Sequence, residues 1–150
     1  LAALGELGIT SSTVAARRFG GPGSVVAAAS RLGVTIEQVL WSDTAAVDRA
    51  AASADLVIST LPASAADPFA ERLHVREGQI LLDVVYSPRD TALRSAFESA
   101  AGVVAEGTDM LVFQAAAQVQ LMTGRSPDTD VMREALEDEL ERRSREGSAP

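Results

Sequence analysis

The stretches that decide the fold are residues 55–60, DLVIST, and residues 79–86, QILLDVVY. Both are short runs of aliphatic and β-branched residues, and the first is bounded by turn-forming residues. Runs of this kind are typical of strands that are covered on both faces, as the strands of parallel sheets are. We therefore expect two buried strands at the centre of the chain.

Strand and helix patterns alternate around these two runs. Strands are expected at 13–17, 36–41 and 103–105, and helices at 22–33, 43–53, 67–73 and 91–102. Pro22 lies near the start of one helix, and Gly33 and Gly102 are expected to end helices. Strands that alternate with helices predict an α/β fold with a doubly wound parallel sheet.

Residues 107–124, GTDMLVFQAAAQVQLMTG, form an unusual segment. No charge occurs from Met110 to Met122, yet three glutamines lie within this run. We expect a helix that begins with a cap at Thr108 or Asp109 and ends at Gly124. A neutral helix of this kind is expected to bridge two bodies of structure. Gln114 then either meets a hydroxyl-rich ligand in the crevice or bonds a neighbouring backbone group.

The last part of the chain, residues 125–150, is highly charged. A helix is expected from Ser126-Pro127 onward, with a narrow apolar stripe and acid-to-base pairs four residues apart. The pairs are Asp138–Arg142, Glu139–Arg143 and Glu141–Arg145. We interpret this charge run as a solvated face, and the final residues are expected to fray.

Composition excludes several classes of function. The chain has 150 residues, enough for one domain, and a net charge of −8, which argues against a nucleic-acid partner. It has no cysteine, which excludes disulfides and thiolate chemistry, and no spacing typical of metal ligands is seen. No apolar run approaches the ~20 residues of a membrane span. These features favour a cytoplasmic protein.

The beginning of the chain is also informative. LAALGELG, residues 1–8, reads as the later part of a helix that stops at Gly8, and no N-cap precedes it. We expect the chain to be a piece of a longer protein.

Candidate ligand-binding residues follow the strands. In open parallel sheets, ligands bind at the carboxyl ends of the strands, and four polar or turn segments are expected there. They are AARR (15–18), STLPAS (59–64), DVVYSP (83–88) and EGTD (106–109). No G-x-G-x-x-G loop is present, and GGPG (20–23) is interpreted as a turn.

Single residues in these segments allow more than one role. Arg17 and Arg18 lie where an Arg of a Rossmann unit accommodates a 2′-phosphate, or they form an exposed pair on a loop. Tyr86 either reaches a polar ligand or packs half-buried. Asp83 is interpreted as an acceptor for backbone N–H groups in the turn, and His74 as a surface residue.

Two segments in combination resemble the C-terminal part of the shikimate dehydrogenase family. Residues 106–127, EGTDMLVFQAAAQVQLMTGRSP, resemble the family's Gly-x-x-Met-Leu-x-x-Gln-Ala helix. Residues 81–93, LLDVVYSPRDTAL, resemble its Asp-x-x-Tyr-x-Pro-x-x-Thr-x-Leu segment. DLVISTLPAS and VAARR occupy the family's third-strand and adenosine-phosphate positions, so the resemblance covers nearly the whole chain.

The resemblance implies a role for each matched residue. Gly107 and Val84 would line the nicotinamide end of the cofactor site, and Thr60 would lie near the ribose. Arg17, with Arg18 as a possible substitute, would meet the 2′-phosphate of NADP. On the substrate side, Tyr86 and Gln114 would contact shikimate. No residue of this chain is expected to be catalytic, because the family's catalytic Lys and Asp lie in an N-terminal substrate domain.

The resemblance implies a Rossmann-like sheet that lacks its first strand, plus C-terminal helices. The expected parts are a partial dinucleotide-binding domain (1–106), a helix that bridges to the substrate domain (107–124), and a C-terminal helix and tail (125–150). The implied activity is NADP-dependent reduction of 3-dehydroshikimate to shikimate, with the chain inactive by itself. One alternative is a non-enzymatic Rossmann-like module that binds a nucleotide or a partner chain. Another is a different Rossmann oxidoreductase with a similar C-terminal part.

Overall fold

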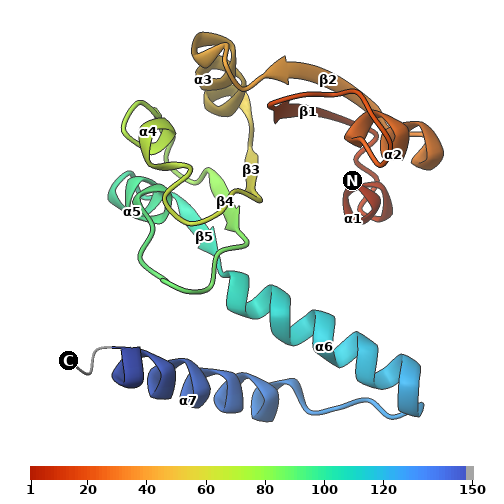
Figure 1. Cartoon of the computed structure of the whole chain (residues 1–150), viewed down its shortest axis with the longest axis vertical. Helices are drawn as coiled ribbons and strands as arrows, with labels where there is room; N and C mark the ends of the chain where they lie inside the picture. The colour runs from red at the N-terminus through yellow and green to blue at the C-terminus, as the bar shows by residue number, and fades with distance from the viewer. Residues whose placement is uncertain (148–150) are drawn as a thin grey trace. The chain divides into compact units, whose positions relative to one another are not determined.

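The computed structural model describes the backbone of residues 1–147 and the side chains of residues 1–145. Within this range helices and strands alternate, and the chain forms two compact units, residues 1–54 and residues 55–150 (Figure 1). The predicted α/β class is confirmed. The predicted domain boundary after residue 106 stays a prediction.

The first unit contains a short two-stranded sheet. Helix α1 (Ala2–Glu6) leads to β1 (Ser11–Ala16), α2 (Val25–Leu32), β2 (Thr35–Leu40) and α3 (Thr44–Ser53). β1 and β2 pair in parallel, with Ser11 opposite Thr35 and Ala16 opposite Leu40. Both α2 and α3 lie against β2, and the buried residues are Ala29, Val39, Val47 and Ala51.

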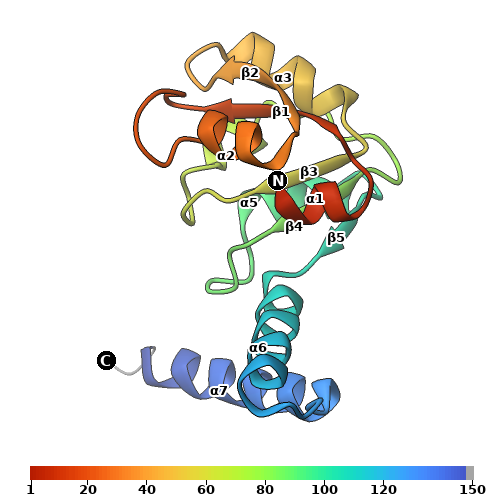
Figure 2. The same ribbon diagram turned by 90° about the vertical axis from the view of Figure 1, so that its right-hand side faces the viewer.

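The second unit is built on a three-stranded sheet. It contains β3 (Leu56–Ser59), α4 (Asp67–Ala70), β4 (Ile80–Asp83), α5 (Ala92–Ser99), β5 (Val103–Ala105), α6 (Gly107–Thr123) and α7 (Thr129–Gly147). The strands pair in parallel in the order β3-β4-β5, and the two runs that decide the fold are the neighbours β3 and β4. Figure 2 shows the three strands side by side.

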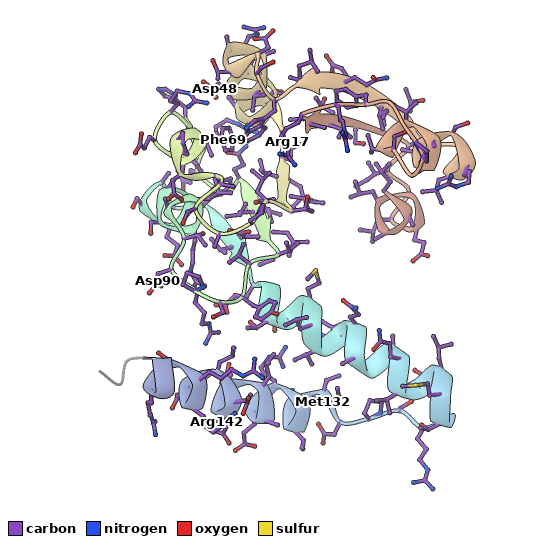
Figure 3. The ribbon with its side chains drawn as sticks, viewed as in Figure 1. Arg17, Asp48, Phe69, Asp90, Met132 and Arg142 are labelled. Atoms are coloured by element: carbon purple, nitrogen blue, oxygen red, sulfur yellow. The ribbon has the colours of Figure 1, made fainter. Side chains whose placement is uncertain are left out.

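The core of the second unit lies between this sheet and its helices. Leu81 on β4 and Phe97 on α5 are both 0% exposed, and Leu93 is 1% exposed. Phe69 on α4, labelled in Figure 3, is also buried. Complete burial of such a side chain contributes about 1.5–3 kcal/mol, so the packing of α5 on β4 and β5 stabilises the second unit.

Two separate parallel sheets agree with a Rossmann-like fold that lacks its first strand. In the strand order 3-2-1-4-5-6, the first strand lies in the middle of the sheet. Without it, one sheet of two strands and one of three remain, as observed within the described residues.

Several predicted helix ends were wrong. α5 ends at Ser99, and the residue with left-handed backbone after it is Ala101 (φ 55°), not Gly102. Gly102 serves a different purpose, because a Cβ there would lie 3.0 Å from the Phe97 carbonyl oxygen and 3.1 Å from that of Gln79. α7 begins at Thr129, where Asp128 Oδ1 accepts the Asp130 and Val131 N–H groups, rather than at Ser126-Pro127.

The start of α6 also differs from its prediction. Its N-cap is Glu106, and neither Thr108 nor Asp109 caps it. The Thr108 hydroxyl instead donates to Glu106 Oε2 at 3.2 Å, and Asp109 binds Arg133 of α7. The predicted end at Gly124 (φ 70°) is confirmed.

Candidate functional site

The carboxyl ends of β3, β4 and β5 form one edge of the second sheet. The register pairs Ser59 with Asp83, and the Val84 N–H donates to the Ser59 carbonyl at 3.1 Å. Thr60 and Val84 therefore leave neighbouring strands at the same edge. On the other side, Leu82 pairs with Ala105, so the chain enters α6 beside Val84.

Gly107 makes the closest approach at this edge. A Cβ atom on Gly107 would lie 2.8 Å from the Val84 carbonyl oxygen and 2.9 Å from that of Asp83. Any side chain would force β4 and α6 apart. The missing side chain thus lets the buried first turn of α6 pack directly on the end of β4.

Asp83 is buried, with 6% of its surface exposed, and organises the turn after β4. Its Oδ1 accepts the Val85 N–H at 3.2 Å, as the turn role predicted, and its Oδ2 accepts the Thr91 hydroxyl at 3.0 Å. The Thr91 hydroxyl oxygen in turn accepts the Arg94 N–H and caps α5. One carboxylate therefore ties both ends of the 84–90 segment together.

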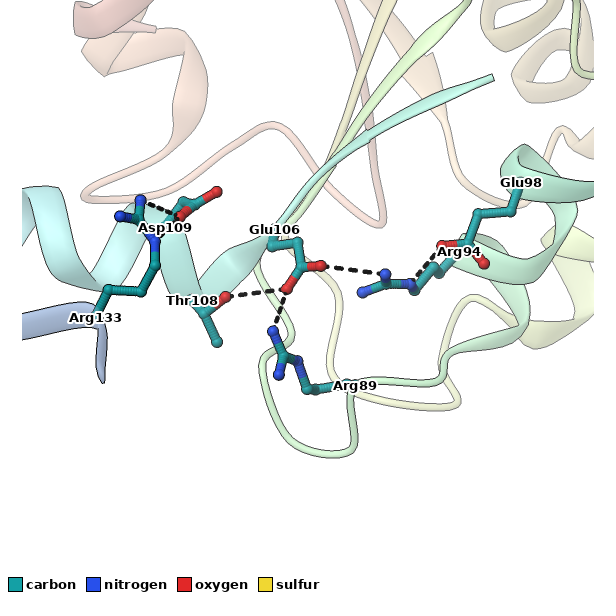
Figure 4. Close-up of polar contacts among 7 residues, drawn as sticks. All are labelled: Arg89, Arg94, Glu98, Glu106, Thr108, Asp109 and Arg133. Atoms are coloured by element: carbon teal, nitrogen blue, oxygen red, sulfur yellow. Dashed lines mark hydrogen bonds and ion pairs between the residues drawn. The ribbon is translucent and has the colours of Figure 1, made fainter. Parts of the chain in front are cut away.

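Glu106 lies between this segment and α5 (Figure 4). Its Oε2 accepts from Arg89 Nη2 at 2.5 Å, and its Oε1 accepts from Arg94 Nη2 at 3.1 Å. The hydrogen bond from Arg89 is the main reason that the pKa of Glu106 is lowered, and Arg94 adds to it, while partial burial acts in the opposite direction. Arg94 Nε also donates to Glu98 at 2.8 Å.

Tyr86 lies at the rim of a shallow hollow formed by these residues. The hollow is lined by Val85, Tyr86, Arg89, Thr91, Glu106 and Gly107, among others. Tyr86 is 42% exposed, so its side chain is only partly buried. The structure brings Tyr86, Val84 and Gly107 together at this edge.

Gln114 lies on α6 but does not line the hollow. It is exposed, and it follows Gly107 by seven residues, which puts the two on the same side of the helix about 10 Å apart along the axis. In α6 only Gly107, Thr108 and Val112 are buried, and its other residues are partly or fully exposed. Its exposed apolar residues are Phe113, Leu121 and Met122.

Arg17 and Arg18 belong to the first unit. Both follow the carboxyl end of β1 and are exposed, and Figure 3 labels Arg17. Arg18 lines a second hollow with the Gly20–Gly23 turn and Ser24. Ser24 caps α2 by accepting the Ala27 N–H, so the helix N-terminus and an Arg guanidinium border the same hollow, an arrangement suited to an anion.

Sequence reasoning missed Arg89, Arg94 and Glu106 as members of the site. They come from a loop, a helix and a strand end, and Glu106 is 17 and 12 residues from its partners. No periodic pattern joins such positions. The sequence gives one hint. Arg89 and Arg94 follow the DVVYSP segment, and the acidic residue Glu106 comes directly before Gly107.

Two searches concern only the residues that the structure describes. No group of three or more His, Cys, Asp or Glu side chains there is arranged to hold a metal ion. No helix in the same range has the length and apolar character needed to cross a membrane.

The fold and the sheet edge define a Rossmann-like class of domain, in which a ligand meets the carboxyl ends of parallel strands. Within that class, the chain resembles the C-terminal region of shikimate dehydrogenases. Residues 107–137 match the shikimate 5′-dehydrogenase C-terminal domain family. This confirms the resemblance carried by the α6 motif.

Known proteins and structures agree with this assignment. The NADP(+) shikimate dehydrogenase of Methanothermobacter thermautotrophicus is 35% identical over 95 residues, 60% of this chain and 34% of that protein. A shikimate 5-dehydrogenase structure from Mycobacterium fortuitum has 38% identity and a TM-score of 0.76, covering 89% of this chain and 49% of that one. The Thermus thermophilus enzyme in complex with shikimate has 27% identity and a TM-score of 0.64, covering 92% and 48%. The chain thus spans about half the length of these solved relatives and a third of the curated one.

Proposed function

We propose that this chain is the cofactor-binding part of an NADP-dependent shikimate dehydrogenase, which reduces 3-dehydroshikimate to shikimate in aromatic amino acid biosynthesis. The observation that carries the proposal is the edge where Gly107, Val84 and Tyr86 meet. The Cβ-free contact of Gly107 brings the backbone of α6 directly against the end of β4, and Gly107 lies inside the residues that match the family. Relatives named for NADP(+) support the choice of cofactor.

The proposed roles follow from the chemistry of hydride transfer. NADPH supplies a hydride to the C3 carbonyl carbon, and the carbonyl oxygen takes up a proton; the protein orients the two reactants. Val84 and Gly107 border the nicotinamide, Thr60 the ribose, and Arg17 with Arg18 the 2′-phosphate. Tyr86 and Gln114 donate or accept hydrogen bonds at the hydroxyl groups of shikimate.

Cofactor preference tests the arginine assignment. We expect the chain to bind NADP+ more tightly than NAD+, and Arg17→Ala with Arg18→Ala to remove this preference, because a charge-assisted contact to phosphate is lost. Arg49→Ala, which removes an exposed arginine of α3, is the matched control and keeps the preference. Titration calorimetry with both nucleotides measures it. Equal affinity of the unaltered chain for the two would reject the assignment.

Turnover tests the enzymatic assignment. We expect no shikimate-dependent reduction of NADP+ by the 150-residue chain, because its sequence contains no lysine to act as the family's catalytic residue. Activity is expected from the protein made with the coding sequence upstream of Leu1, if that sequence supplies a Lys and an Asp. Nucleotide binding without any shikimate turnover by that longer protein would favour the non-enzymatic module.

Location and partners are part of the same proposal. A biosynthetic dehydrogenase of this class would work in the cytoplasm on small molecules. The net charge of −8 argues against a nucleic-acid partner.

A further inference from the structure

The Glu106 carboxylate joins three parts of the second unit. It accepts from Arg89 on the 84–90 segment, from Arg94 on α5, and from Thr108 on α6 (Figure 4). The residue that follows it is Gly107, whose backbone packs on Val84. Glu106 is therefore the polar link between the segment that carries Tyr86 and the helix that carries Gln114.

We propose that Glu106 is a positioning residue that sets the distance and angle between the Tyr86 segment and the first turn of α6. This inference rests on the proposed function for its consequence, since those two elements hold the proposed substrate contacts. Its geometry stands independently of any ligand.

The geometry gives Glu106 this role rather than Asp83. Asp83 closes the segment on itself, because its partners Val85 and Thr91 both lie at the ends of that segment. Glu106 contacts the segment itself at Arg89 and comes from the start of α6. Only the Glu106 contacts among these fix the segment relative to α6.

The contact between Glu106 and Arg89 lies near the surface, between the elements that it joins, and not in the core. The side chain of Glu106 is 28% exposed and that of Arg89 is 42% exposed. Loss of the carboxylate should therefore loosen the segment while Leu81, Leu93 and Phe97 keep the core packed.

Glu106→Gln is the test variant and Glu98→Gln its matched control. Glu98 also binds Arg94, at 2.8 Å, but both residues lie on α5, so this bond stays within one helix. Each change removes one carboxylate from the same arginine. Glu106→Asp keeps the charge and is expected to restore part of the effect.

Amide hydrogen exchange of the full 150-residue chain is the first measurement. The Val85 and Thr91 amides are hydrogen-bonded in the segment and report on it. We expect their exchange to speed up by about threefold to tenfold in Glu106→Gln, the effect of losing a partly exposed charge-assisted bond. The amides of β4 should be unchanged. The proposal would be overturned if the exchange rates of the Val85 and Thr91 amides did not change in Glu106→Gln, or if they changed equally in Glu98→Gln.

Ligand binding is the second measurement and separates this proposal from the proposed function. In the longer protein that turns over shikimate, Glu106→Gln should raise the KM for shikimate while the KM for NADP+ changes little. Glu106→Asp should give a KM for shikimate between those of the unaltered protein and Glu106→Gln. An equal rise in the KM for shikimate and the KM for NADP+ would indicate a merely structural role and would overturn the proposal. If no form of the protein turns over shikimate, the proposed function fails, and the exchange result still decides whether Glu106 holds the segment.

Discussion

Gly107 shows how one absent side chain sets the contact between a strand and a helix. Its backbone lies where a Cβ would be 2.8 Å from the Val84 carbonyl oxygen. The neighbours are backbone atoms of two consecutive residues and cannot rotate away as a side chain could. The strain would have to be relieved by moving β4 or α6.

Gly107→Ala should therefore destabilise the chain. Overpacking of this kind costs about 1–3 kcal/mol, and urea unfolding followed by circular dichroism measures it. Gly20→Ala is the control, because nothing lies within 4 Å of a Cβ at Gly20, and it should change stability by less than about 0.5 kcal/mol. A Gly107→Ala variant as stable as Gly20→Ala would show that the contact relaxes without cost.

The hairpin of α6 and α7 depends on a contact between charged side chains. Arg133 of α7 donates from Nη2 to Asp109 Oδ1 of α6 at 2.6 Å and from Nε at 3.1 Å (Figure 4). Its guanidinium carbon also lies 6.0 Å from the centre of the Phe113 ring. Phe113 is itself 58% exposed, so this contact lies at the surface of the two helices.

Arg133→Gln should free α7 from α6. The amides of α7 would then exchange faster, because an isolated charged helix of this length is only marginally stable in water. Arg145→Gln is the control, since the ion pair of Arg145 with Glu141 stays within α7. Equal protection of α7 in both variants would mean that Arg133 does not hold the hairpin.

The helicity of α7 should also depend on pH through Glu139. Hydrogen bonds from Arg142 and then Arg143 lower the pKa of Glu139 from 4.5 to about 2. A carboxylate with a lowered pKa in the folded state stabilises that state above its unfolded pKa and ceases to do so as the pH falls. The contribution should disappear between pH 4.5 and about 2.

The measurement compares the unaltered chain with Glu139→Gln by circular dichroism at 222 nm across this range of pH. The difference in helicity between the two should shrink as the pH falls through the window. It should also be smaller at high salt, because the pair is exposed and screened. A difference that is independent of pH would contradict the role of the Glu139 carboxylate.

At the scale of the whole molecule, α6 exposes three large apolar side chains. Leu121 is 86% exposed, Met122 75% and Phe113 58%. Exposed apolar side chains of this size promote association in water when they gather on one surface. The bridging role proposed for α6 would cover it in a longer protein.

The 150-residue chain should therefore associate as its concentration rises. Leu121→Gln with Met122→Gln should reduce that association, measured by sedimentation velocity over a range of concentrations. Leu7→Gln is the control, because Leu7 is also 75% exposed but lies in the first unit. Association that is the same in all three proteins would place the contact elsewhere.

Short-range patterns in the sequence were enough to predict the elements and their kind. The apolar runs at β3 and β4 and the uncharged run at α6 predict buried strands and a helix, because periodicity and turn residues act within about ten residues. The same patterns placed the segments DVVYSP (83–88) and EGTD (106–109) at the carboxyl ends of the strands and predicted that Asp83 accepts N–H groups in the turn. The roles of Val84 and Gly107 came from the family resemblance.

Only the tertiary structure decided which side chains meet across elements. Glu106 binds arginines from two other segments. Thr108 and Asp109 do not cap α6 as predicted, because they bind Glu106 and Arg133 instead. Gly102 is needed for a close approach rather than for its own backbone angle. The physical reason is that hydrogen bonds between segments far apart in the chain depend on distances that packing sets, and no local pattern records them.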